Sequence, residues 1–298
     1  MEQQKIKIAF IGLGVMGYPM SGHLYHAGYD VTVFNRHRDK AEKWFAEYVS
    51  SGKRAFISDS IAGACSAVDI VFTCVGNDDD LAGIMLGKAG VLENCRSGTV
   101  ICDHTTSSAA LARKLAKQAQ DAGLEFLDAP VSGGQLGAQK GQLSIMVGGS
   151  QSSFEKVNRV LRCYGKTVRW IGESGSGQLA KMVNQICITG ILQGLSEALY
   201  FGKQAGLDLE KVLEVISKGA AQSWQMDNRA ATMLQGEFDF GFAVDWMRKD
   251  LAFVLDEARQ MNIDLPLVQQ VDEYYKEVQA LGGGRWDTSS LLQRLDKK

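Results

Sequence analysis

The chain has 298 residues, 45% of them hydrophobic, and a formal net charge of −2, so it can bury the core of one large domain or of two ordinary ones. The near-neutral charge gives no reason to expect nucleic acid as a partner, and no apolar stretch of about 18 residues indicates a membrane span. The N-terminus leads directly into the first expected strand without room for a signal peptide, and the six cysteines form no Cys-x-x-Cys pair, so we expect a cytoplasmic protein with free thiols and no metal site.

The first expected element is a buried strand that ends in glycines. Residues 6–17, "IKIAFIGLGVMG", place Gly-x-Gly-x-x-Gly directly after an apolar run, and the next segments predict a helix and a second strand. In such a strand–turn–helix unit, the bare backbone N–H groups and the helix N-terminus can bind a pyrophosphate. The alternative is an ordinary glycine turn, but the surrounding pattern favours a dinucleotide site.

Up to residue 172 the chain alternates strand-like segments with segments of helical periodicity. The expected strands are 6–12, 29–35, 69–76, 98–105, 125–133, 143–149 and 167–172, and one of the intervening helices is 107–123. This alternation predicts a mostly parallel sheet with helices on both faces. We therefore expect a first domain, residues 1–173, of the α/β class with a Rossmann-type dinucleotide-binding fold.

From Ser176 onward almost every segment has helical spacing. Residues 177–206 contain no proline and predict one long helix that is largely apolar around its circumference, which favours burial between domains or subunits. Further helices are expected at 208–219, 243–262 and 265–282. We therefore predict a second, all-helical domain, residues 174–298, which closes over the substrate and forms a homodimer or homotetramer.

The end of the second expected strand favours NADP as cofactor. An acidic side chain at this position would bind the adenosine ribose of NAD, but the sequence reads Asn35-Arg36-His37-Arg38. Asp30 precedes the strand and should lie at its wrong end. A guanidinium suits the 2′-phosphate of NADP, so we assign Asn35 and Arg36 to cofactor binding. The alternative is that Arg36 and Arg38 are solvated turn residues, and NAD is the other possible cofactor.

Four motifs in this order resemble those of the β-hydroxyacid dehydrogenase family: "FIGLGVMGYPM", "DAPVSGGQLGAQKGQLSIMVGG", "GSGQLAKMVNQ" and "WMRKDLAFVLDEA". That family includes 3-hydroxyisobutyrate dehydrogenase and tartronate semialdehyde reductase, and the resemblance spans essentially the whole chain. It implies a C-terminal domain like that of 6-phosphogluconate dehydrogenase. It also implies oxidation of small hydroxy acids, or reduction of the matching semialdehydes, with a nicotinamide cofactor.

The resemblance also implies roles for individual residues. Lys181 matches the catalytic lysine. The cofactor-binding positions it implies are Gly12, Leu13, Gly14, Val15, Met16, Gly17, Val75, Gly76, Thr106 and Lys249. The substrate-binding positions are Ser132, Gly133, Gly134, Asn184, Gln185, Trp224 and Asp250. Trp224 and Phe240 would line the substrate pocket, although both could equally be core aromatics.

The chemistry of alcohol oxidation agrees with a lysine base. The nicotinamide takes the hydride, and a side chain must take the proton where no metal is bound. Lys181 lies within an otherwise apolar helix, where Gly177, Asn184 and Gln185 share its face. The positive charge of the oxidised nicotinamide and desolvation would both lower the pKa of a lysine here. His104, at the end of a strand, is the rival base.

We therefore expect an NADP-preferring dehydrogenase of a small 3-hydroxy acid, or a reductase of the matching semialdehyde. One alternative is a related enzyme that reduces imines, although such relatives usually change the catalytic lysine. The other is a non-catalytic nucleotide-sensing module. The sequence does not choose among the possible hydroxy acids, because one methylene in a pocket is worth only about 1–3 kcal/mol.

Overall fold

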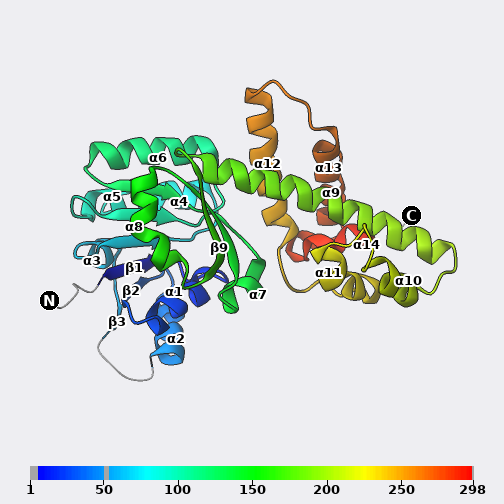
Figure 1. The fold of residues 1–298 in the computed structure, drawn as a ribbon, viewed down its shortest axis with the longest axis horizontal. Coiled ribbons are helices and arrows are strands. Elements are labelled where there is room, and N and C mark those ends of the chain that lie inside the picture. Colours follow the sequence, from blue (N-terminus) through cyan, green and yellow to red (C-terminus); the bar gives the residue numbers. More distant parts are fainter. Residues whose placement is uncertain (1–5, 50–53, 297–298) are drawn as a thin grey trace. The chain divides into compact units, whose positions relative to one another are not determined.

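The computed structural model describes residues 6–49 and 54–296. The chain divides into two compact units, of which the first ends at Lys181 and the second begins at Met182. Helix α9 (Ser176–Gln204) contains this division and continues through it as one helix of 29 residues (Figure 1). The expected long helix at 177–206 is therefore confirmed.

Over its described residues, the first unit is built on one nine-stranded sheet. Its path runs β3-β2-β1-β4-β5-β6-β8-β7, and β9 pairs with β8. The pairs are parallel from β3 through β6, whereas β8 runs antiparallel to β6 and β7. The strands are β1 (Lys7–Ile11), β2 (Asp30–Phe34), β3 (Ala55–Ile57), β4 (Ile70–Thr73), β5 (Val100–Asp103), β6 (Glu125–Asp128), β7 (Val131–Ser132), β8 (Leu143–Gly148) and β9 (Gly165–Gly172).

The α/β architecture expected from the sequence is confirmed, with two differences in detail. The expected strand 125–133 is divided into β6 and β7 around Ala129 and Pro130, where the proline has no N–H to donate to a sheet. Strand β3 was not predicted, because its three residues are too few to show a period of two.

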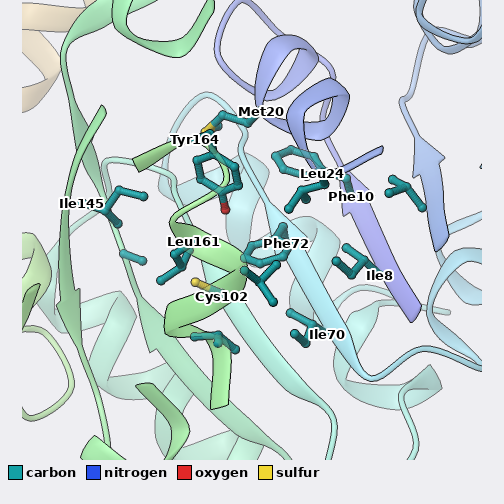
Figure 2. Close-up of a cluster of buried hydrophobic side chains, with 14 of the residues drawn as sticks. Ile8, Phe10, Met20, Leu24, Ile70, Phe72, Cys102, Ile145, Leu161 and Tyr164 are labelled. Carbon is teal, nitrogen blue, oxygen red and sulfur yellow. The ribbon is translucent and has the colours of Figure 1, made fainter. Parts of the chain in front are cut away.

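Helices cover both faces of this sheet because alternate strand residues point to opposite sides. Ile8 and Phe10 of β1 belong to a cluster with side chains of α1, α2 and α8, whereas Ala9 and Ile11 pack with α3, α4, α5 and α6. Figure 2 shows the first cluster, with Phe10, Phe72 and Tyr164 among its labelled members. The helices of this unit are α1 (Gly17–His26), α2 (Arg38–Tyr48), α3 (Ile61–Cys65), α4 (Asp78–Leu86), α5 (Val91–Asn94), α6 (Ala109–Asp121), α7 (Gly134–Gln139) and α8 (Gln151–Leu161).

The second unit is helical in the part that the structure describes, as expected. After α9 come α10 (Leu209–Ile216), α11 (Trp224–Gln235), α12 (Val244–Gln260), α13 (Pro266–Ala280) and α14 (Leu291–Asp296), with 3₁₀ turns at Gly283–Arg285 and Thr288–Ser290. Sequence signals set these boundaries: Ser223 caps α11 by accepting from the N–H of Met226, and Gly236 ends it in the left-handed region. Pro266 opens α13, where its missing N–H costs nothing.

Candidate active site

The glycine turn after β1 has the geometry that a phosphate site needs. A Cβ on Gly12, whose φ is +98°, would lie 2.2 Å from the carbonyl oxygen of Cys74, and a Cβ on Gly17 would lie 2.0 Å from that of Gly12. Gly14 differs, because a Cβ there would meet no described atom within 4 Å. The fold itself therefore requires glycine at 12 and 17, whereas the open space at Gly14 leaves the backbone accessible to a ligand.

Asn35 supports this turn from the end of β2. Its Oδ1 accepts a hydrogen bond from the N–H of Leu13 at 2.9 Å, and its Nδ2 donates to the carbonyl of His37 at 2.9 Å. Asp30 is the first residue of β2, opposite Lys7 in the register, so it lies at the far end of the strand from Asn35. Asp30 therefore does not supply a carboxylate at the end of β2 that is next to Asn35.

The two arginines after β2 lie in different surroundings. Arg38 pairs with Glu42 at 2.8 Å and also contacts Asp59. Arg36 has an 81% exposed side chain, and its Nη1 lies 3.7 Å from Oδ1 of Asp80. Arg36 is thus the guanidinium that a ligand at the end of β2 could reach with little rearrangement, and Asp80 is the carboxylate nearest to it.

A buried polar network joins the ends of β4 and β5. The N–H of Val75 donates to Oγ1 of Thr105 at 3.1 Å, and that hydroxyl donates to Oδ1 of Asp103 at 2.7 Å. Thr73 donates to the same oxygen at 2.6 Å. The segment with Val75 and Gly76 is therefore tied to the segment that contains Thr106, which brings predicted cofactor positions from two strands together.

Burial disfavours the charged form of Asp103. Desolvation raises its pKa to about 7, although hydrogen bonds from Thr73 and Thr105 oppose the shift. Its Oδ2 has no hydrogen-bond partner among the described residues. Burial also raises the pKa of Asp128, the register neighbour of Asp103 on β6, to about 6.

We expect Asp103→Asn to change how stability depends on pH. Because the pKa of Asp103 is higher in the folded than in the unfolded chain, its protonated form stabilises the fold when the pH is below the unfolded-state pKa. This contribution is lost as pH rises from about 4 to about 7. The amide stays neutral and its Oδ1 can still accept the three existing bonds. Across that pH window, the free energy of unfolding of the variant should therefore rise relative to that of wild type, by roughly 4 kcal/mol at most. Urea unfolding at a series of pH values measures this, and a difference independent of pH would contradict it.

His104, the rival base, is a core residue. Its ring stacks on Phe72 with centroids 5.5 Å apart, and only 2% of the residue is exposed. Burial lowers its pKa to about 4, so the ring is neutral near pH 7. Nδ1 then donates to the carbonyl of Ala129 at 2.6 Å, and Nε2 accepts from the hydroxyl of Tyr164 at 2.8 Å. Both nitrogens are engaged, which removes the support for His104 as a base.

The loop between β7 and α7 contains the predicted carboxylate site. Gly133 and Gly134 have φ values of +128° and +60°, a succession that glycines adopt without strain. A Cβ on Gly134 would meet no described atom within 4 Å. Ser132, the last residue of β7, is partly buried beside them. The Ser-Gly-Gly sequence therefore gives this loop a backbone that is open to a small ligand.

Helix α9 carries Lys181, which is buried with 8% of its surface exposed. One turn earlier, Gln178 bonds to the segment around Thr106: its Oε1 accepts from the N–H of Ser107 at 3.1 Å, and its Nε2 donates to the carbonyl of Thr105 at 2.8 Å. Sequence analysis did not single out Gln178. Only the spacing "GQLAK" could have indicated it, since its partners lie more than 70 residues away.

Four predicted residues of the second unit form one chain of contacts. Asn184 donates to Oε1 of Gln185 at 2.8 Å, and Gln185 donates to Oδ2 of Asp250 at 2.7 Å. The other oxygen of Asp250 lies 3.2 Å from Nζ of Lys249. Helices α9 and α12 thus bring together residues that the sequence separates by about 65 positions.

Trp224 and Phe240 both lie against the guanidinium of Arg229. The guanidinium carbon is 5.0 Å from the Trp224 ring and 4.9 Å from the Phe240 ring, and Nε lies 3.3 Å from Oδ1 of Asp287. Trp224 is 50% exposed, so it is not a core aromatic. Sequence reasoning missed Arg229, the charged residue that holds the two rings together.

Within residues 6–49 and 54–296, no cluster of three His, Cys, Asp or Glu side chains could hold a metal ion, and none of the helices has the length and apolar character of a membrane span. The six cysteines are free thiols.

Comparison with known proteins gives matches over nearly the whole chain. Residues 7–172 match the family described as the NAD binding domain of 6-phosphogluconate dehydrogenase, and residues 175–295 match that described as NAD-binding of NADP-dependent 3-hydroxyisobutyrate dehydrogenase. An uncharacterized oxidoreductase of Shewanella frigidimarina is 56% identical over 291 residues, covering 98% of each chain. The 2-(hydroxymethyl)glutarate dehydrogenase of Eubacterium barkeri is 37% identical, covering 98% of this chain and 95% of its own.

Among solved structures, 3-hydroxyisobutyrate dehydrogenase of Mycobacterium tuberculosis with L-serine is similar in fold. Its TM-score is 0.87 at 27% identity, and the match covers 98% of this chain and 99% of that one.

Proposed function

Because this chain belongs to the β-hydroxyacid dehydrogenase family, and is thus an NAD(P)-dependent oxidoreductase of hydroxy acids, we propose that it interconverts a small 3-hydroxy acid and its semialdehyde. The observation that carries the proposal is the burial of Lys181 on α9, one turn after a glutamine bonded to the Thr106 segment. A buried lysine beside a dinucleotide site is suited to proton transfer.

The relatives' names support the proposed substrate class. Serine, 3-hydroxyisobutyrate and 2-(hydroxymethyl)glutarate share a CH₂OH group on the carbon that bears a carboxylate, and they differ only in the third substituent of that carbon. We assign the carboxylate to Ser132, Gly133 and Gly134, and the CH₂OH group to Lys181. Asn184, Gln185, Trp224 and Asp250 are the further substrate-binding residues of the proposal.

The described residues fit a nicotinamide dinucleotide. The open backbone at Gly14, in a turn held by the hydrogen bond from the N–H of Leu13 to Asn35, suits a pyrophosphate, and Val75, Gly76 and Thr106 would follow the rest of the cofactor. Lys249 is a further cofactor-binding residue of the proposal. A bound nicotinamide would supply the hydride chemistry between the alcohol and the aldehyde. Lys181 receives the hydroxyl proton during oxidation and donates it during reduction.

The experiment that tests this function is steady-state oxidation of 3-hydroxypropionate, serine and 3-hydroxyisobutyrate with NADP⁺ or NAD⁺, followed by the absorbance of the reduced cofactor. Turnover of at least one of these acids is expected. If none is oxidised and no matching semialdehyde is reduced, the proposed substrate class is wrong.

We propose that NADP is the preferred cofactor and that Arg36 selects it. Arg36→Ala should raise the dissociation constant of NADPH at least about tenfold, because a charge-assisted contact is worth about 1.5–3 kcal/mol, and should leave that of NADH nearly unchanged. Fluorescence titration with both cofactors measures this.

Two neighbours supply matched controls for Arg36. Asp80→Asn removes the carboxylate 3.7 Å from Arg36 and should tighten NADPH binding. Arg38→Ala removes a guanidinium already paired with Glu42 and should have a smaller effect than Arg36→Ala. Equal losses of NADPH and NADH affinity in Arg36→Ala would assign Arg36 another role.

We also propose that the protein is a cytoplasmic homodimer or homotetramer joined through its helical second domain. Exposed apolar side chains in the second unit support such association: Phe201 on α9 and Val215 on α10 are both 73% exposed in the single chain. The division between domains at residues 173 and 174 likewise stays a prediction.

A further inference from the structure

Gln178 occupies an unusual place in the first unit. It lies in the first turn of α9, it is 1% exposed, and both ends of its side-chain amide are bonded to one short backbone segment. Oε1 accepts from the N–H of Ser107, and Nε2 donates to the carbonyl of Thr105, so the amide spans Thr106. A buried amide with both partners satisfied holds the two segments in a single arrangement.

The backbone of α9 is fixed at the same point by Asp128. Its Oδ1 accepts from the N–H of Gly175 at 2.8 Å, and its Oδ2 accepts from the N–H of Gln178 at 2.9 Å. These N–H groups lie at the start of the helix, where no carbonyl within the helix is available to them. A Cβ on Gly177 would lie 2.4 Å from the carbonyl oxygen of Asp128, so the helix start packs directly on the end of β6.

Lys181 follows Gln178 by three residues, about 4.5 Å along the helix axis and on the same face. The segment to which Gln178 is bonded, residues 105–107, also accepts a hydrogen bond from the N–H of Val75 through Oγ1 of Thr105. One side chain therefore connects the helix of the proposed base to the segments proposed to bind the cofactor. All of these contacts lie within the first unit.

We propose that Gln178 is a positioning residue, which sets Lys181 in register with the nicotinamide end of the cofactor by bonding to the backbone on both sides of Thr106. This inference rests on the proposed function. Proton and hydride leave the alcohol together, so both acceptors must be aligned with it, and a misplacement of about 1 Å can cost a factor of about 100 in rate. Asp128 holds the start of the helix, and Gln178 sets its alignment with the Thr106 segment.

The test compares Gln178→Met with wild type and with Thr99→Val. Methionine keeps the length and burial of the side chain but forms neither bond. We expect kcat, normalised to NADPH-binding sites counted by fluorescence titration, to fall at least about tenfold, with the NADPH dissociation constant within about threefold of wild type. Thr99→Val also removes a buried hydrogen bond, which Thr99 donates to the carbonyl of Val68. Thr99 precedes the first residue of β5, whereas the segment bonded to Gln178 follows the last residue of that strand. It should leave the normalised kcat unchanged.

Gln178→Glu gives a second readout that a purely structural role would not move. Its carboxylate can accept from Ser107 but opposes the carbonyl of Thr105, whereas the protonated form restores the donor. Its normalised kcat relative to that of Gln178→Met should therefore rise as pH falls from about 8 to about 6. Asp103, bonded to Thr105, and Asp128, bonded to the N–H of Gln178, titrate in both variants and cancel in this ratio.

The outcomes separate this inference from the proposed function. Lack of turnover by wild type would refute the function itself, and full activity of Lys181→Ala would refute the proposed role of Lys181. With those two results as expected, a normalised kcat of Gln178→Met within about threefold of Thr99→Val overturns the positioning role. If Gln178→Met does not fold, the pH dependence of Gln178→Glu relative to wild type decides by the same reasoning. If neither variant folds, Gln178 is a structural residue and the inference is wrong.

Discussion

Lys181→Ala should abolish turnover while the protein still folds and binds cofactor. General acid–base catalysis is typically worth a factor of about 10²–10⁴, and both nitrogens of His104, the rival base, are engaged in the core. Tryptophan-fluorescence titration with NADPH and steady-state rates measure the two effects separately.

His104→Gln is the matched control for that experiment. It removes the rival base and disturbs the bonds to Ala129 and Tyr164. It should therefore lower the melting temperature, while the rate per NADPH-binding site stays close to that of wild type. A Lys181→Ala enzyme that keeps more than about a tenth of the wild-type rate would show that the proton moves by another route.

The substrate carboxylate should be obligatory. Replacing a 3-hydroxy acid by its methyl ester should lower kcat/KM by a factor of about 10³ or more, because a site built to bond a charged group rejects analogues that leave its donors unpaired. Simple alcohols such as 1-propanol should be nearly inert. By contrast, exchange of the third substituent among hydrogen, methyl and amino groups should have much smaller effects.

Ser132→Ala locates the carboxylate site on the loop that precedes α7. It should raise KM for every acid substrate and leave the NADPH dissociation constant unchanged, whereas Ser144→Ala, an exposed neighbour on the adjoining strand β8, should change neither. If the ester is used within about tenfold of the acid, Ser132, Gly133 and Gly134 do not form a carboxylate site.

The sequence predicted the elements of the fold because they depend on local patterns. Alternating apolar segments and glycine turns indicated the strands from β1 to β9, except for β3, whose three residues carry no period. The reversal of direction at β8 could not be predicted, since apolar strands look alike whether their neighbours run parallel or antiparallel.

Residues of the candidate site could be predicted only where they belong to a recognisable sequence motif. The glycine turn and Lys181 were found from the sequence, the latter by resemblance. Gln178, Asp128 and Arg229 were not, because their significance depends on partners about 50 to 70 residues away. His104 shows the opposite error. A histidine at the end of a strand resembles a catalytic base until the structure shows its ring enclosed by Phe72 and Tyr164.

The three glycines of the turn after β1 are constrained in different ways. Gly12 and Gly17 are constrained by the folded chain itself, whereas a Cβ at Gly14 would meet no described atom within 4 Å. If the turn binds a pyrophosphate as we propose, a homologue that has lost its cofactor could accept a side chain at 14 and remain folded, while retaining glycine at 12 and 17. We therefore expect the middle glycine to report whether a lineage still uses the dinucleotide, and the outer two to report only that it still folds.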